Sequence, residues 1–350
     1  MPELFPLPQY YHPLPPSPAA DAATTELPIT RHGIRQLTPW PFARQTTPSF
    51  PLLTIRTPGL PIARGVCGLL PATAFLDGSV RPHEDTLGAR LDRQRDLVRR
   101  DRGALGKPVL LTTPKLPLIE DMPAGRALLT YRCNKLKYTL HTGRPANAPV
   151  SLPGEASPLV IADGHHRAYT HAALAAEGRP EFTYLPVVIV PGSALRIGAF
   201  QRLIAGEGRT LQQLQQQLAA YFTITPLPRP TPVTQSGMWL LAYRGQYAHL
   251  RRRLPTPDTD PGWLSRTVLP AVFGITDMRT DPRILSVDPP ALHHGQYQYS
   301  TTLEDRISLL GYPVDHASFF GEVAAGRLFP PKSTRFEPRI PSGLLVWIPT

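Results

Sequence analysis

The segment with the clearest chemistry in this 350-residue chain is Asp163-Gly164-His165-His166-Arg167. The apolar run SPLVIADG leads into it, and HRAYTHAALAAEG, with helical spacing and a closing glycine, follows, so it is predicted to join a buried strand to a helix. A helix start attracts anions, Gly164 lets a ligand approach the backbone closely, and Arg167 can grip phosphate oxygens. The segment therefore predicts a phosphate site, at which Asp163 is expected to hold Mg²⁺.

A zinc site is the alternative for His165, His166 and His171. Adjacent histidines on a helix face different directions, and no cysteine or glutamate has the spacing needed to complete a tetrahedral set. The chain contains two cysteines, Cys67 and Cys133, which are too few for a four-cysteine zinc site or a disulfide framework. The phosphate site is therefore the favoured interpretation.

A second segment, RPHEDT, places Glu84 between His83 and Asp85. An acid next to a histidine and just before a helix can act as a general base or orient a nucleophile. The polar pattern that follows predicts a helix over residues 86–102, and Thr86 can cap that helix. Capping alone is the alternative explanation of this segment.

A third segment, PKST at residues 331–334, brings Lys332 next to two hydroxyl side chains. The glycine-rich lead of a phosphate loop is missing, so the segment is not a Walker A motif. Lys332 can still supply positive charge to a phosphoryl group in transfer. A surface loop without chemistry is the alternative.

The composition limits the kind of fold that can position these segments. Proline makes up 44 of the 350 residues, whereas its usual share is roughly 5%. An interior proline removes a backbone donor and clashes with the preceding helical turn, which excludes a bundle of long helices. Hydrophobic residues still make up 41% of the chain, as in globular proteins. We therefore expect many short elements joined by rigid turns.

Apolar patterns indicate the elements around the candidate site. KPVLLTT predicts a short buried strand, and two hairpins are predicted, with turns near Asn134 and at Arg244-Gly245. EFTYLPVVIV predicts a second buried strand after the helix, so the middle of the chain is expected to form a sheet with crossover connections. The ending LLVWIP predicts a closing strand.

The net charge of +11 raises the question of nucleic-acid binding. It is the difference between 37 basic and 26 acidic residues, and it includes the basic runs Arg99-Arg100 and Arg251-Arg252-Arg253. The arginines are spread over the whole chain, however, and no known DNA-binding pattern stands out. A solvated surface, or attraction for small anionic substrates such as nucleotides, explains the charge better.

In their order along the chain, the three segments resemble the bacterial and archaeal family called domain of unknown function 1015. The resemblance rests on IADGHHR at residues 161–167, RPHEDT at 81–86 and PPKSTRFEP at 330–338. It extends over about residues 65–350. The segment with which family members usually begin has no counterpart here, and Ala168 stands where the signature commonly has tyrosine.

That family resembles the ParB/sulfiredoxin superfamily, which implies a small mixed sheet that binds nucleotide through a Gly-x-x-Arg turn, here Gly164 to Arg167. Some members are free-serine kinases, and they carry a Pro-His-Glu segment whose glutamate is the catalytic base. Matched residue by residue, that glutamate is Glu84. Sulfiredoxins have a catalytic cysteine where this chain has His165, so reduction of sulfinic acids is not expected, because it requires a thiol.

The fold predicted from residues and resemblance is α+β. A Pro-rich irregular arm is expected over residues 1–60 and a ParB/sulfiredoxin-like nucleotide-binding core over 61–205. An α+β region over 206–350 is expected to fold back on the core, because Lys332 is far from Arg167 in sequence.

The predicted function is that of a nucleotide-dependent kinase for a small hydroxyl compound, with free serine as the first candidate. ATP or ADP with Mg²⁺ is the expected cofactor. Glu84, His83 and Lys332 are the expected catalytic residues, and residues 163–167 are expected to hold the nucleotide. A nucleotide-binding regulator without turnover is the alternative, and DNA binding is less favoured. No apolar run is long enough to span a membrane, and a cytosolic protein is expected.

Overall fold

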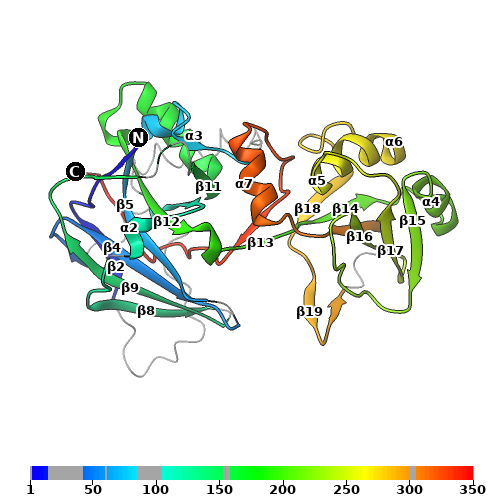
Figure 1. The fold of residues 1–350 in the computed structure, drawn as a ribbon, viewed down its shortest axis with the longest axis horizontal. Helices are drawn as coiled ribbons and strands as arrows, with labels where there is room; N and C mark the ends of the chain where they lie inside the picture. Colours follow the sequence, from blue (N-terminus) through cyan, green and yellow to red (C-terminus); the bar gives the residue numbers. More distant parts are fainter. Residues whose placement is uncertain are drawn as a thin grey trace. The chain divides into compact units, whose positions relative to one another are not determined.

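The computed structural model describes residues 2–14, 42–59, 61–84, 105–120, 122–133, 135–152, 154, 158–299 and 305–349. They form two compact units (Figure 1), of which the first comprises Met1–Arg196 and Phe336–Thr350 and the second Ile197–Arg335. The chain passes from one unit to the other within β13 (Arg196–Gly198) and β22 (Arg335–Glu337). The boundary expected after residue 205 therefore differs from the one observed, and the last residues belong to the first unit.

The first unit is built on an eight-stranded mixed sheet with the strand order β6-β11-β7-β12-β5-β4-β9-β8. The pairs β6–β11 and β7–β12 are parallel, and the other neighbours are antiparallel. β1–β10 and β2–β3 form two small sheets beside it. The strands and helices of this unit are β1 (Glu3–Leu4), β2 (Tyr10–Pro13), β3 (Phe42–Gln45), β4 (Ser49–Arg56), β5 (Ala63–Pro71), a 3₁₀ turn (Ala72–Phe75), β6 (Val80–Arg81), β7 (Val109–Thr113), α2 (Pro117–Glu120), β8 (Ala127–Cys133), β9 (Leu136–Pro145), β10 (Val150–Ser151), β11 (Leu159–Asp163), α3 (His165–Ala176), a 3₁₀ turn (Pro180–Phe182), β12 (Tyr184–Pro191) and a 3₁₀ turn (Gly192–Ala194).

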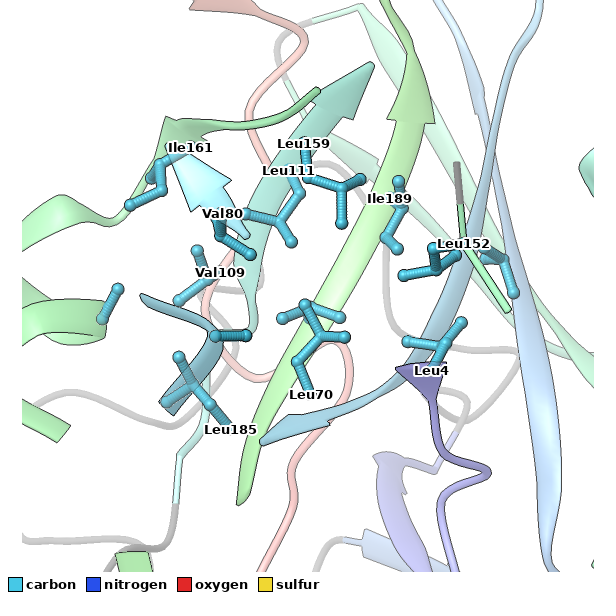
Figure 2. Close-up of a cluster of buried hydrophobic side chains, with 14 of the residues drawn as sticks. Leu4, Leu70, Val80, Val109, Leu111, Leu152, Leu159, Ile161, Leu185 and Ile189 are labelled. Atoms are coloured by element: carbon cyan, nitrogen blue, oxygen red, sulfur yellow. The ribbon is translucent and has the colours of Figure 1, made fainter. Parts of the chain in front are cut away.

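The core of this unit explains why the site strands lie inside the sheet. All five residues of β7 are buried, as the apolar run VLLTT predicts. Its side chains Val109 and Leu111 pack with Leu159 and Ile161 of β11 and with Val80 of β6 (Figure 2). The alanines on the inner face of α3 join the same cluster, so the helix lies close against the sheet. The strands that lead into the candidate site are thus held by neighbouring strands and, on one face, by α3.

The first 60 residues contain regular structure where an irregular arm was expected. Residues 15–41 lie outside the described part, but β4 runs between β5 and β9 in the large sheet. The single proline of β4 does not prevent this, because the register with β9 shifts between Phe50 and Leu52 and leaves Pro51, which has no N–H to donate, at the irregularity. Leu52, Leu53 and Ile55 are buried on either face.

The order strand, tight turn, helix, strand is confirmed for β11, α3 and β12. The connection passes over one strand, because β7 lies between β11 and β12. Since β7 is antiparallel to β11 and parallel to β12, the two joined strands run in opposite directions. The β11–α3–β12 connection is therefore not the parallel crossover of a doubly wound sheet. The hairpin predicted near Asn134 is confirmed by the pairing of β8 with β9.

The second unit has a six-stranded sheet with the order β15-β17-β16-β21-β14-β18. The predicted Arg244-Gly245 hairpin is confirmed, and both turn residues have positive φ, 47° and 73°. The fold class of the chain is therefore α+β in both units. The elements of this unit are β14 (Gln201–Ala205), α4 (Leu211–Leu218), β15 (Phe222–Leu227), β16 (Met238–Tyr243), β17 (Gln246–Arg252), α5 (Asp260–Trp263), a π-helical turn (Leu264–Val268), α6 (Leu269–Phe273), β18 (Ile284–Val287), β19 (Ala291–His293), β20 (Gln296–Gln298), β21 (Arg306–Gly311) and α7 (His316–Ala324).

The end of the chain forms isolated bridges where a closing strand was expected. Val346 pairs with Tyr11, and Trp347 pairs with Leu105, the described residue that opens the segment before β7. The helix expected over residues 86–102 lies outside the described part of the chain. Among the described helices, none combines the length and apolar character that crossing a bilayer requires.

Candidate functional site

The segment 163–167 adopts the geometry that its sequence predicts. β11 ends at Asp163, and α3 begins at His165 after Gly164, whose φ of 109° is open to glycine and strained for other residues. A Cβ at position 164 would lie 2.6 Å from Nη2 of Arg167. Glycine therefore permits the turn and also leaves room for the guanidinium group beside the backbone.

Two cationic side chains converge on Asp163. Lys107 Nζ lies 2.9 Å and Arg167 Nη2 lies 3.5 Å from Asp163 Oδ2. The same Nη2 donates to the carbonyl of Pro108 at 3.4 Å, while the buried Nε of Arg167 has no hydrogen-bond partner among the described residues. These three described side chains together carry one net positive charge beside the start of α3.

The charge states follow from these contacts. Burial raises the pKa of the Asp163 carboxyl, but the charges of Arg167 and Lys107 outweigh burial and bring that pKa well below its usual range. Burial lowers the pKa of the Lys107 ammonium, and the charge of Asp163 opposes this shift. Asp163 is therefore a carboxylate at neutral pH, and it holds two cations beside the helix start.

The described residues around Asp163 do not form a complete set of protein ligands for Mg²⁺. Such an ion takes six oxygen ligands in octahedral geometry. The described residues contain no group of three or more His, Cys, Asp and Glu side chains that could hold a metal. Asp163 also already faces Lys107 and Arg167, whose charges repel a further cation. Asp163 as a Mg²⁺ ligand therefore stays a prediction, and water or the phosphates of a nucleotide would supply most of the other ligands.

Residues 81–84, the RPHE segment, lie beside the turn at residues 163–167, because β6 runs parallel to β11 and both strands end at the same edge. Pro82 has no N–H and cannot extend the ladder. The buried side chain of His83 provides the next hydrogen bond to β11 instead, since its Nδ1 donates to the carbonyl of Ile161 at 2.6 Å. The same ring packs edge to face on His165, with ring centroids 4.6 Å apart. The two segments are thus joined through His83.

Glu84 follows this anchored histidine. Its Oε2 lies 4.0 Å from Nε2 of His83, and its side chain is 11% exposed. His83 is buried and bonded at Nδ1, so its position suits it to orient Glu84 and the turn. Asp85 and Thr86 lie outside the described part, and with them the alternative of a Thr86 cap.

The three histidines of the zinc alternative do not converge. His165 is buried against His83, while His171 lies further along α3, where its Nε2 bonds the carbonyl of Tyr184 at 2.8 Å. His166 is half-buried at the start of the helix. His171 is thus a core residue with a backbone partner, and it belongs to the fold rather than to a metal site.

His171 also provides a test of the packing of α3. Burial lowers the pKa of His171 from 6.5 to about 4, and the hydrogen bond to Tyr184 opposes this shift. The unfolded chain therefore binds the proton more readily, and the free energy of unfolding should fall by up to about 3 kcal/mol as the pH drops from about 6.5 to about 4. In urea unfolding, His171→Gln should flatten this part of the pH profile relative to the wild type. Equal slopes in the variant and the wild type would contradict the assignment.

Lys332 belongs to the second unit. Its Nζ lies over the ring of Phe200, 5.5 Å from the centroid, and its φ is 57°. The loop around it is held by Ser333, whose hydroxyl donates to the carbonyl of Pro330 at 2.6 Å, and by a bond from Arg202 to the carbonyl of Pro331. The action of Lys332 on a phosphoryl group stays a prediction.

The basic run 251–253 has structural uses in the second unit. Arg252 Nη1 pairs with the buried Asp260 at 2.8 Å, and Arg253 Nε donates to the carbonyl of Phe222 at 3.1 Å. The run Arg99-Arg100 lies outside the described residues. Two of the three arginines in this run therefore have partners within the unit.

Two basic residues near the turn are not singled out by the sequence. Lys107 is one of five lysines in the chain and precedes a buried strand, which is a weak signal. Arg339 acts on the charges of both Asp163 and Lys107, and its carbonyl accepts a bond from the hydroxyl of Tyr138 at 2.8 Å. Phe336, near it in sequence, packs edge to face on His83 with ring centroids 5.4 Å apart. The PPKSTRFEP segment thus does contribute to this site, through the residues after Lys332.

Several solved structures are similar to this chain. The sequence matches no curated protein. Similar solved structures include SbnI with a C-terminal truncation from Staphylococcus aureus, with 16% identity, a TM-score of 0.45 and coverage of 81% of this chain and 87% of that chain. A free serine kinase in complex with AMP has 13% identity, a TM-score of 0.42 and coverage of 96% and 98%. A conserved hypothetical protein from Pyrococcus furiosus has 16% identity, a TM-score of 0.42 and coverage of 79% and 93%.

The family model described as protein of unknown function (DUF1015) matches residues 41–269. This match includes both the RPHE segment and the turn at residues 163–167, and it also includes β4, which the sequence resemblance did not reach. The match covers well over half of the chain. The chain therefore belongs to the DUF1015 family.

Proposed function

We propose that the protein is a nucleotide-dependent kinase that phosphorylates the hydroxyl group of a small molecule, with free serine as the first candidate. The observation that carries the proposal is the convergence of Lys107 and Arg167 beside the left-handed Gly164 at the start of α3. Phosphoryl transfer depends chiefly on positioning and charge neutralisation, and this arrangement offers both. ATP or ADP would supply the phosphoryl group.

In this mechanism the turn at residues 163–167 binds the nucleotide, and the RPHE segment activates the substrate hydroxyl. Gly164 and Arg167 hold the phosphates at the positive end of the helix dipole. The substrate hydroxyl oxygen attacks the terminal phosphorus, its proton passes to the carboxylate of Glu84, and the bond to the bridging oxygen breaks to release AMP from ADP or ADP from ATP. His83 orients Glu84 through its bond to Ile161. The proposed role of Lys332 is to stabilise the charge of the moving group.

Serine as the acceptor rests on the resemblance of the Pro-His-Glu segment and the Gly-x-x-Arg turn to those of free-serine kinases. The same resemblance supports a ParB/sulfiredoxin-like character for the first unit. A small acceptor also agrees with the burial of Glu84, whose side chain is 11% exposed, because a base so placed suits a compact hydroxyl compound better than a protein side chain.

The direct experiment incubates purified protein with Mg²⁺, with ATP or ADP, and with free serine, and follows phosphoserine by ³¹P NMR. A panel of other small hydroxyl compounds runs in parallel. Formation of a phosphorylated product together with the shortened nucleotide is the expected result. No phosphorylated product from any acceptor with either nucleotide would contradict the proposal.

A nucleotide-binding regulator without turnover is the second candidate. The observation that favours it is the state of Asp163, which is paired with two cations, in a described part of the chain without a ready metal-ligand set. This function predicts that nucleotide binds in a manner that depends on Arg167 while the acceptor panel yields nothing. Isothermal titration with ADP and ATP, set beside the product assay, separates the two functions.

A further inference from the structure

We propose that Lys107 and Arg167 form a two-pronged clamp for the polyphosphate of a nucleotide, and that Asp163 is the counter-ion of this clamp rather than a ligand of magnesium. The inference deepens the proposed function and rests on it for the identity of the ligand. It assigns a binding role to Lys107 and changes the expected role of Asp163.

The geometry of the clamp comes from two neighbouring strands. Arg167 lies in the first turn of α3, after β11, and Lys107 lies just before β7, which pairs with β11. Because β7 and β11 are antiparallel, the start of one and the end of the other meet at the same edge of the sheet. Asp163 Oδ2 is the common partner, at 2.9 Å from Lys107 and 3.5 Å from Arg167. The two cations are therefore held within reach of a single anionic group.

Lys107 is held in place by the end of the chain. Leu105 and Trp347 exchange two backbone hydrogen bonds, of 2.9 and 3.0 Å, and the N–H of Gly343 donates to the carbonyl of Gly106. Pro108 then fixes the backbone on the other side, and its carbonyl accepts from Arg167. The short segment that carries Lys107 is thus anchored on both sides, as a preorganised binding residue requires.

The charges favour a ligand with more than one negative charge. Lys107 and Arg167 carry two positive charges against the one of Asp163, and Arg339 adds to the positive field at both Asp163 and Lys107. A single phosphate at the helix start needs only Arg167. A second cation next to it matches the second phosphate of a diphosphate or triphosphate chain. Asp163 keeps the two like charges together while no ligand is bound.

The first test measures binding of inorganic pyrophosphate in EDTA by isothermal titration calorimetry. Lys107→Ala should weaken binding by about ten- to a hundredfold, the loss expected for one charge-assisted hydrogen bond. Lys107→Arg should retain most of the affinity. Lys115→Ala, which removes an exposed lysine from the same stretch of chain, should change the affinity by less than about twofold, since exposed charges act weakly.

Thermal unfolding shows whether each variant is folded, and Lys107→Met replaces the alanine variant if that one is not. Binding in Lys107→Ala or Lys107→Met that equals the wild type would overturn the clamp. So would a wild-type protein that does not bind millimolar pyrophosphate.

The second test separates the counter-ion from the metal ligand. The ratio of the pyrophosphate affinities measured with Mg²⁺ and with EDTA should be the same for Asp163→Asn and for the wild type. This includes the case in which Mg²⁺ changes the affinity of neither protein. If Mg²⁺ increases the pyrophosphate affinity of the wild type but not that of Asp163→Asn, the role given to Asp163 is overturned. Asp163→Ser serves the same purpose if the asparagine variant does not fold.

Failure of the proposed function would look different. These titrations use pyrophosphate and no acceptor, so a lack of phosphorylated product would leave the clamp standing. If the wild type makes phosphoserine and its Lys107→Ala variant binds pyrophosphate as tightly as the wild type, the proposed function is supported and the clamp is contradicted.

Discussion

Replacing Glu84 by glutamine should lower the rate constant of phosphoryl transfer by about 10²- to 10⁴-fold, the usual contribution of a general base. Glutamine keeps the size of the side chain but cannot accept the proton of the attacking hydroxyl. Because Glu84 touches the reaction rather than the nucleotide phosphates, the dissociation constant for ADP or ATP should change little. Single-turnover assays of product, together with nucleotide titrations, measure the two quantities separately.

The matched control is Glu120→Gln, which removes the same charge from an exposed position in the same unit. It should leave both the rate and the binding near the wild-type values. A Glu84→Gln protein that turns over at the wild-type rate would remove the proposed base. A variant that instead loses nucleotide binding with an unchanged rate at saturation would show that Glu84 supports the turn rather than the chemistry.

Replacing Arg167 by alanine should weaken nucleotide binding by about 10²- to 10³-fold, since it removes two charge-assisted hydrogen bonds to phosphate. Among the described residues, the change also leaves Lys107 as the ion-pair partner of Asp163, and it removes one positive charge from the site. The measurement is an ADP titration at constant ionic strength. Arg179→Ala, near the other end of α3, removes an exposed arginine and should bind as the wild type does.

A double-mutant cycle with Gly164 checks the physical reason. A Cβ at position 164 would lie 2.6 Å from Nη2 of Arg167, so Gly164→Ala should displace the guanidinium and weaken binding in the wild-type background. In the Arg167→Ala background this displacement has no consequence, and the second change should cost less. Additive losses would indicate that the two residues act independently.

The parts of the site that depend on residues adjacent in the sequence were predictable from the sequence. The left-handed turn follows from a glycine between an apolar run and a helical pattern, and Arg167 lies one helical turn beyond it. The meeting of the RPHE segment with this turn required the resemblance, because no local pattern reveals that β6 pairs with β11.

Lys107 was not predictable for the same reason. Its neighbour in space, Asp163, is 56 residues further along the sequence, and only the pairing of β7 with β11 brings them together. In isolation, a lysine before a buried strand looks like an ordinary solvated end. β4 was likewise not predictable, because the proline count indicates irregular structure and does not reveal that Pro51 lies where the register shifts.

The anchoring of Lys107 by Trp347 has a consequence for biosynthesis. The first unit contains both ends of the described chain, with the second unit inserted between Arg196 and Phe336 (Figure 1). While the ribosome is still making the second unit, the strands of the first can pair, but the residues that bond Leu105 and Gly106 do not yet exist. Closing such long loops is slow compared with local folding. The nascent protein should therefore acquire its fold before Lys107 is held in place, and bind nucleotide more weakly until synthesis has passed the residues around Trp347.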